Sequence, residues 1–159
     1  MDIQRLSVDE GLRLRHLRLR ALADAPDAFG STYGETAARP MESWAQQLQE
    51  IATFVAVEDG ADVGLVRCAH DAHHRDTAWL ISMWVAPDTR GKGVGNALVD
   101  AVIECARASG ATRLLLDVAD DNRQAIALYA RKGFVPNGVT GSLPAPRDHI
   151  REHQREFRL

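Results

Sequence analysis

The spacing of apolar positions in the first part of the chain predicts two helices after a short strand. Ile3–Leu6 is expected to be the strand, and Ser7 with Glu10 three residues later is typical of a capping box at a helix start. The following stretch to Ala23 places leucines at mixed spacing among arginines, a run of strong helix formers. Pro26 and Gly30 interrupt the pattern, and a second helix is expected over Met41–Glu50.

The middle of the chain has the pattern of antiparallel strands. Residues 51–57 are β-branched, aromatic and small apolar, and Asp59-Gly60 is a hairpin turn signal. Residues 63–69 are expected to form the partner strand. The polar segment 71–76 predicts a second turn before a third strand over residues 77–85.

The last part of the chain alternates strand and helix. Gly93–Ser109 has apolar residues at helical spacing and is followed by Gly110, a typical helix end. Residues 114–118 predict a buried strand, and Asn122–Lys132 a helix that Gly133 ends. Residues 134–135 and 156–159 are expected to be two short strands around a loop at 136–149. The whole chain, residues 1–159, is therefore predicted to be one mixed α/β domain.

Composition limits the function classes. The 159 residues are 45% hydrophobic and 26% charged, as in ordinary globular domains, and the net charge of −3 gives no electrostatic reason to expect nucleic acid as a partner. No apolar run approaches the roughly 20 residues that span a bilayer, and the N-terminus lacks a signal-peptide pattern. Cys68 and Cys105 have no metal-ligand spacing. We expect a cytoplasmic protein with reduced cysteines, no metal and no membrane partner.

A glycine-rich turn carries the main chemical signal. Residues Arg90-Gly91-Lys92-Gly93-Val94-Gly95-Asn96 lie between a predicted strand and a predicted helix, where unpaired helix N–H groups favour an anion. A P-loop would need glycine at position 86 and Ser or Thr at position 93, which are Ala and Gly. A dinucleotide fingerprint starting at Gly91 or Gly93 would end on Asn96 or Leu98, so it fits poorly. The pattern [Gln/Arg]-x-x-Gly-x-[Gly/Ala] matches at every fixed position.

With its flanking motifs, this turn resembles the GCN5-related N-acetyltransferase family, known as GNAT. Met83-Trp84-Val85-Ala86-Pro87 looks like the strand end that leads into the family's loop, and Asn122 with Tyr129-Ala130-Arg131-Lys132-Gly133-Phe134 looks like its later signature. The resemblance is strongest over residues 79–134. It implies an α+β fold with a mixed, mostly antiparallel sheet of six to seven strands, about four helices and a splay between the fourth and fifth strands.

The resemblance also implies roles for particular residues. Acetyl-CoA would be the cosubstrate, with its pyrophosphate on the backbone N–H groups of residues 90–96 and its pantetheine arm along Met83, Trp84 and Val85. Asn122 would also bind the cosubstrate. The N–H near Val85 would stabilise the oxyanion, and Tyr129 would protonate the leaving thiolate, as a phenol can at neutral pH. From the residues alone, Tyr129 could equally be a core aromatic and Asn122 a helix cap.

The general base is not identified by the sequence. Many relatives carry Glu on the strand that corresponds to residues 77–85, where Ser82 is the only polar residue after Trp79. Asp117, His149 and His153 are further candidates, as are the three histidines of the turn at residues 70–74. A water chain could also remove the proton.

The acceptor is expected between residues 25–35 and the last loop. Phe29, Tyr33, Trp44 and Trp84 could line an apolar pocket, although Phe29 and Trp44 could equally pack helix on sheet. Carboxylates at 35, 42 and 148 could attract an amine. The acceptor would be a small-molecule amine or a peptide, and an exposed edge strand would permit a homodimer. Two alternatives stay open: an acyl-CoA-binding module without catalysis, and a nucleotide-phosphate-binding domain.

Overall fold

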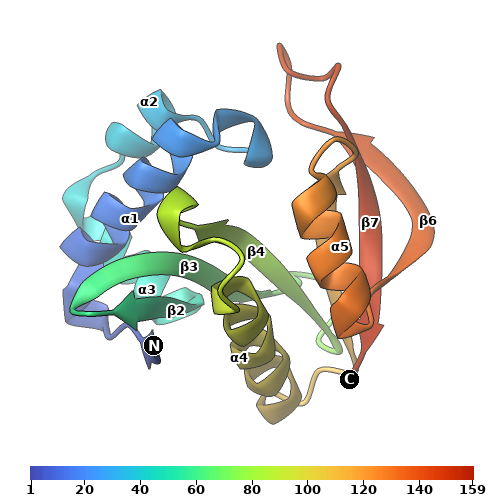
Figure 1. Ribbon diagram of the computed structural model, residues 1–159, viewed down its shortest axis with the longest axis horizontal. Coiled ribbons are helices and arrows are strands. Elements are labelled where there is room, and N and C mark those ends of the chain that lie inside the picture. The colour runs from blue at the N-terminus through green and yellow to red at the C-terminus, as the bar shows by residue number, and fades with distance from the viewer.

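Seven strands form one sheet in the order β1-β2-β3-β4-β5-β7-β6 in the computed structural model, which describes residues 1–159 (Figure 1). The strands are β1 (Asp2–Arg5), β2 (Ala52–Glu58), β3 (Ala61–His70), β4 (Thr77–Val85), β5 (Arg113–Ala119), β6 (Val135–Ser142) and β7 (Arg151–Arg158). All neighbouring pairs are antiparallel except β4 and β5, which are parallel. This confirms the mixed, mostly antiparallel sheet.

Five α-helices cover the sheet. They are α1 (Gly11–Asp24), α2 (Tyr33–Ala37), α3 (Met41–Glu50), α4 (Val94–Ala108) and α5 (Arg123–Lys132). Helices α1 and α3 lie on one face of the strands β2 to β4, and α4 lies on the other face (Figure 1). The short α2 was not expected from the pattern, although Thr32 and Glu35 make a capping box at its start.

Helix α4 packs against strands β2, β3 and β4 through its buried side chains. Its buried side chains are Val94, Leu98, Val99, Val102, Ile103 and Ala106. Each fully buried aliphatic side chain of the larger kind stabilises the fold by about 1.5–3 kcal/mol relative to exposure. Gly64 on β3 allows this helix to approach closely, because a Cβ there would lie 2.9 Å from Leu98 Cδ1. The start of α4 is therefore fixed against β3.

The prediction of a loop over residues 136–149 is wrong. Strand β6 continues to Ser142, and β7 already begins at Arg151, so the two strands form a long hairpin. Most side chains of β6 are exposed, so the strand lacks the apolar alternation by which a half-buried strand is recognised. Backbone pairing with β7 determines this strand instead.

The strands β4 and β5 separate after a short paired segment. Only Thr77–Trp79 pairs with Arg113–Leu115, so the later part of β4 and the end of β5 diverge. A β-bulge contributes to this, because Ser82 and Met83 together lie opposite the single residue Val66. Ser82 has a φ of 60°, in the left-handed region. The expected splay between the fourth and fifth strands is confirmed.

Candidate active site

The loop between β4 and α4 has the backbone geometry of an anion site. Gly91 and Gly93 have φ values of 78° and 88°, and Gly93 is the residue that precedes the first turn of α4. A Cβ on either glycine would meet no atom within 4 Å, so the backbone faces open space. Left-handed glycines next to a helix start present N–H groups to an anion without a side chain in the way. Lys92 is exposed beside them.

Arg90 joins this loop to the end of α1. Its Nη2 lies 2.6 Å from Asp24 Oδ2, and its Nε donates to the Val85 carbonyl at 2.9 Å. The same Asp24 oxygen accepts a hydrogen bond from Trp84 Nε1 at 2.9 Å, and the Arg20 guanidinium lies 5.0 Å from the Trp84 ring centroid. The guanidinium of Arg90 is thus held by protein groups, and backbone N–H groups are left to face a ligand.

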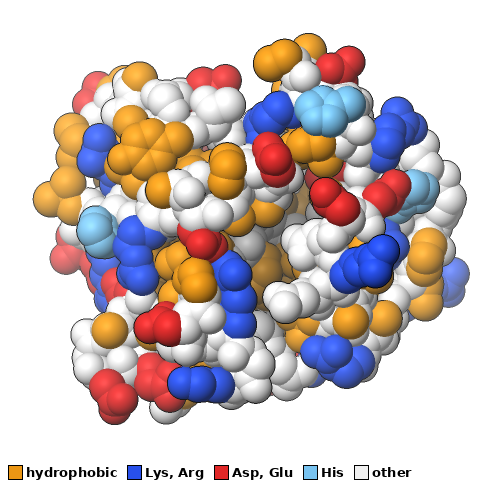
Figure 2. All heavy atoms as spheres, turned by 45° about the horizontal axis from the view of Figure 1, so that its top comes forward, with side chains coloured by type: hydrophobic (Ala, Val, Ile, Leu, Met, Phe, Trp, Pro, Cys, Tyr) orange, Lys and Arg blue, Asp and Glu red, His pale blue; other side chains and the backbone are white.

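A cavity of about 870 Å³ extends from this loop through the splay between β4 and β5. Figure 2 shows the molecular face that contains this hollow, between the half with α1 and the half with α5. Its walls come from the turn after α1, the end of β4, the glycine loop and α5. Among the predicted site residues, it is lined by Phe29, Met83, Trp84, Val85, Arg90, Gly91, Gly93, Val94, Gly95, Asn96 and Asn122. The volume is sufficient for an extended ligand of drug size or larger.

The backbone at Val85 points its polar groups into the splay. The N–H of the next residue, Ala86, bonds to Val63 O on β3 at 2.8 Å. In an antiparallel ladder, successive residues direct their N–H groups to opposite edges, so the N–H of Val85 points away from β3. The Val85 carbonyl, on the same edge, accepts from Arg90. An N–H donor therefore lies free where β5 has separated.

Tyr129 lies on α5 behind the cavity wall, with 5% of its surface exposed. Its ring packs edge-on against Phe134, with 5.7 Å between the centroids. Burial raises the pKa of its hydroxyl well above the ordinary value of 10. The neighbouring Leu128 and Ala125 line the cavity, whereas Tyr129 itself is not among the lining residues. Its phenol stays protonated at neutral pH.

Asn122 both caps α5 and borders the cavity. Its Oδ1 accepts a hydrogen bond from Ala125 N at 3.3 Å. Gly95, at the start of α4, lets this helix approach the second half of α5, because a Cβ there would lie 3.0 Å from Leu128 Cδ2. Residues of both helices thus line the cavity.

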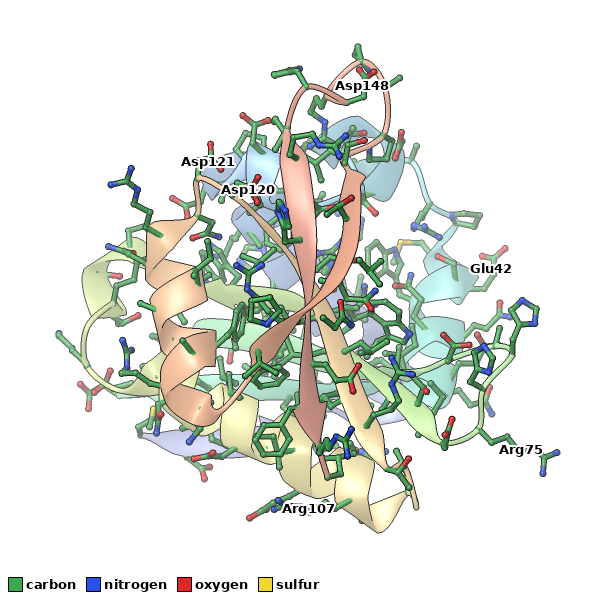
Figure 3. The ribbon with its side chains drawn as sticks, turned by 90° about the vertical axis from the view of Figure 1, so that its right-hand side faces the viewer. Glu42, Arg75, Arg107, Asp120, Asp121 and Asp148 are labelled. Carbon is green, nitrogen blue, oxygen red and sulfur yellow. The ribbon has the colours of Figure 1, made fainter.

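The loop between β6 and β7 reaches across to the turn after α1. Arg147 donates hydrogen bonds to the carbonyls of Pro26, Phe29 and Gly30 at 2.7, 2.9 and 2.9 Å. Figure 3 shows the neighbouring Asp148 at the tip of this loop. The two segments expected to enclose an acceptor are therefore joined by one side chain.

Two carboxylates lie on β5 and β7, near the cavity residue Ala119. Glu152 on β7 pairs with Ala119 of β5, a cavity residue, and Asp117 is two residues earlier on the same strand face. Desolvation raises the pKa of Asp117, and desolvation together with the charge of Asp117 raises the pKa of Glu152. Asp117 is a candidate from the sequence pattern, whereas Glu152 becomes one only through the pairing of β7 with β5, which the sequence does not reveal.

The remaining candidates lie elsewhere. Tyr33 is 49% exposed on α2, and Trp44 is buried against Gly11 of α1, so neither lines the cavity. Glu42 projects outward from α3 (Figure 3). His153 pairs with Asp120 at the start of α5. No group of three or more His, Cys, Asp or Glu side chains has an arrangement that could hold a metal ion.

Comparisons with known proteins agree with this geometry. The model of the acetyltransferase (GNAT) family matches residues 15–134. A structure described as an acetyltransferase of the GNAT family from Streptococcus pneumoniae superposes with a TM-score of 0.82 at 22% identity, over 99% of each chain. At this identity the likeness concerns the fold.

No helix of the chain combines the length and the apolar character needed to cross a membrane.

Two curated relatives are similar in sequence. An uncharacterized N-acetyltransferase of Methanocaldococcus jannaschii is 35% identical over 95 residues, which cover 57% of this chain and 42% of that protein. Mycothiol acetyltransferase of Beutenbergia cavernae is 30% identical over 145 residues, which cover 82% of this chain and 43% of that protein. The chain thus spans less than half the length of these two relatives.

Proposed function

Since the chain belongs to the GNAT family of acetyltransferases, we propose that it transfers the acetyl group of acetyl-CoA to a primary amine of a small molecule or peptide. The observation that carries the proposal is the single cavity that joins the glycine loop to the unpaired end of β4. The loop offers backbone N–H groups to a pyrophosphate, and the strand edge offers backbone partners to an extended amide-bearing arm. These are the two chemical parts of coenzyme A.

The residues present fit this cosubstrate, which supplies an activated acetyl thioester. Residues 90–96 would hold the pyrophosphate, and Met83 to Val85 would pair with the pantetheine arm. The free N–H of Val85 would stabilise negative charge on the carbonyl oxygen during direct attack by the amine. Arg90 and Asp24 keep the end of β4 in place for this.

Tyr129 is the proposed general acid. Its phenol would donate a proton to the departing sulfur, and burial keeps it protonated. The hydroxyl makes no hydrogen bond within the chain and is not one of its fully enclosed polar atoms, so it is available for this role. We expect Tyr129→Phe to lower kcat by about 100-fold or more, with little change in the Kd of coenzyme A.

The test is incubation with acetyl-CoA and a panel of primary amines, with release of free thiol as the readout. Tyr33→Phe is the matched control, because Tyr33 is exposed and lies outside the cavity. Unchanged turnover in Tyr129→Phe would remove this residue from the mechanism. Tight coenzyme A binding without transfer to any amine would contradict the proposal.

A second candidate is an acyl-CoA-binding module without catalysis. The absence of a carboxylate on β4 between Trp79 and Val85 favours it. The same incubation distinguishes the two, because this module would bind acetyl-CoA and release no thiol above the buffer rate. Calorimetry with ATP and coenzyme A tests the nucleotide-binding alternative, which requires tighter binding of ATP.

A further inference from the structure

Two arginines are buried on the α1 side of the sheet, beside the cavity. Arg18 on α1 is 5% exposed, and Arg67 on β3 is 7% exposed. Moving a guanidinium out of water costs several kcal/mol unless an anion or a full set of hydrogen bonds compensates. Each buried guanidinium therefore needs a partner, which is supplied either by the chain itself or by a ligand.

The chain provides no anion for them. Neither guanidinium forms a salt bridge, and the charged groups that act on them are all cationic, namely Arg39 on Arg18, and Arg18 with Arg39 on Arg67. Desolvation first, and these like charges second, lower the pKa of Arg18 to about 10 and that of Arg67 to about 9. Both side chains therefore remain cationic at neutral pH.

Hydrogen-bond donors around these arginines are also unused. Arg67 donates to Ser82 Oγ at 2.9 Å and to Gln47 Oε1 at 3.0 Å, which fixes its orientation. Arg18 donates no hydrogen bond within the chain, and its Nη1 is enclosed without a partner. The Nε2 of Gln47 is likewise enclosed and unpaired. Buried polar groups are almost always paired in folded proteins, so these two unpaired donors, on Arg18 and on the Gln47 that orients Arg67, indicate a missing acceptor.

The arginines adjoin the proposed acetyl-transfer site. The Arg18 guanidinium lies 5.4 Å from the ring centroid of Phe29, and Phe29 lines the cavity. Ser82, the partner of Arg67, is at the bulge directly before Met83, which also lines the cavity. Ser82 lies three residues before Val85, and a strand advances about 3.3 Å per residue, so Arg67 contacts β4 at a point about 10 Å before the end of the strand.

We propose that Arg18 and Arg67 form the acceptor-recognition site and bind a carboxylate of a small amine substrate. This rests on the proposed acetyl transfer and specifies its substrate class, a molecule that carries both an amine and a carboxylate. A planar carboxylate accepts two parallel N–H bonds from one guanidinium and offers lone pairs to Gln47 and to the second arginine. Its negative charge replaces the anion that the fold does not provide.

The experiment compares common L-amino acids with their carboxamides, which keep the amine but lack the carboxylate charge. Binding to the full chain is followed by calorimetry and thermal shift, and acetylation by thiol release. We expect one or more amino acids to bind and react, and their carboxamides to be at least about 30-fold poorer in kcat/KM. Arg18→Met and Arg67→Met are expected to remove this discrimination. Arg75→Met is the matched control, because Arg75 projects from an exposed turn (Figure 3).

The outcomes separate this inference from the proposed function. Carboxylate-dependent binding that the two variants abolish, without any acetylation, would support the anion site and contradict acetyl transfer. Equal use of acids and carboxamides would overturn the anion site and leave acetyl transfer intact. If coenzyme A binds but no amino acid does, the proposed anion site would also be overturned. A preference for aminophosphonates over amino acids would overturn the assignment to a carboxylate.

Discussion

In the proposed carboxylate site, Arg18 would bind a ligand at the expense of the stability of the unliganded chain, because it is buried without an anionic partner. Replacing an uncompensated buried ion with an apolar side chain of similar volume is often stabilising, by about 1–4 kcal/mol. We expect Arg18→Met to raise the Tm of the unliganded chain by several degrees, at about 2–4 °C per kcal/mol for this size. Thermal unfolding followed by circular dichroism measures this. A lower Tm would show that Arg18 is compensated within the chain.

We propose Glu152 as the base that accepts the proton of the amine, because it pairs with the cavity residue Ala119. A base works in its ionised form, and desolvation with the nearby Asp117 raises its pKa above the usual 4.5. We expect Glu152→Gln to lower kcat and to remove an ionisation from the acidic limb of the kcat/KM profile against pH. Rate measurements from pH 5 to 9 test this, with Glu156→Gln as the control. An unchanged profile would exclude Glu152 as the base.

The raised pKa of Glu152 also predicts how the stability of the folded chain changes with pH. A carboxyl whose pKa is raised in the folded state favours folding when protonated, and this contribution is lost as the pH rises through the folded pKa. The Glu152→Gln variant should therefore be stabilised relative to the native chain at neutral pH, and no longer so below the ordinary glutamate pKa of 4.5. Denaturant unfolding at both pH values measures the difference.

At the scale of elements, the proposed binding of pyrophosphate by the glycine loop depends on its backbone conformation more than on its side chains. Gly93 has a φ of 88°, and an L-residue in the left-handed region costs about 1–2 kcal/mol. We expect Gly93→Ala to lower the free energy of unfolding by that amount and to weaken coenzyme A binding. Urea unfolding and calorimetry measure the two effects. Gly141→Ala is the control, since Gly141 has open space around it and no positive φ. Equal effects in both variants would contradict this role of Gly93.

The sequence predicts elements well where the local pattern decides their structure. The start of α4 follows from Gly93 and the apolar residues after it, and the end of α5 from Gly133, which is in the left-handed region as expected. Strand β6 was largely missed, because pairing with β7 determines it. The arginine site could not be predicted either. Arg18 and Arg67 are distant in the sequence, and only the packing of α1 on β3 and β4 brings them together.

At the scale of the whole molecule, the two halves on either side of the cavity are joined by Arg147. Its three hydrogen bonds involve a charged donor, and losing one such bond costs about 1.5–3 kcal/mol. We expect Arg147→Ala to raise the KM of the acceptor by about tenfold or more, while the KM of acetyl-CoA changes little. Steady-state kinetics with each substrate varied in turn gives the comparison.

The control for this variant is Arg151→Ala, which removes an exposed arginine at the start of β7, near the same loop, whose side chain makes no hydrogen bond or ion pair. Equal effects of the two substitutions would mean that the loss reflects charge alone. An increase in the KM of acetyl-CoA by the same factor would mean that the loop supports the whole cavity rather than the acceptor side.

The bonds of Arg147 have a further consequence for how such a protein can diverge. All three acceptors are main-chain oxygens, so the attachment requires the backbone path of residues 26–30 but no particular side chain there. Mutations in this turn can therefore accumulate and reshape the entrance while the two halves stay connected. Substitutions at residues 26–30 can therefore change the substrate preference without a compensating substitution in the loop that carries Arg147.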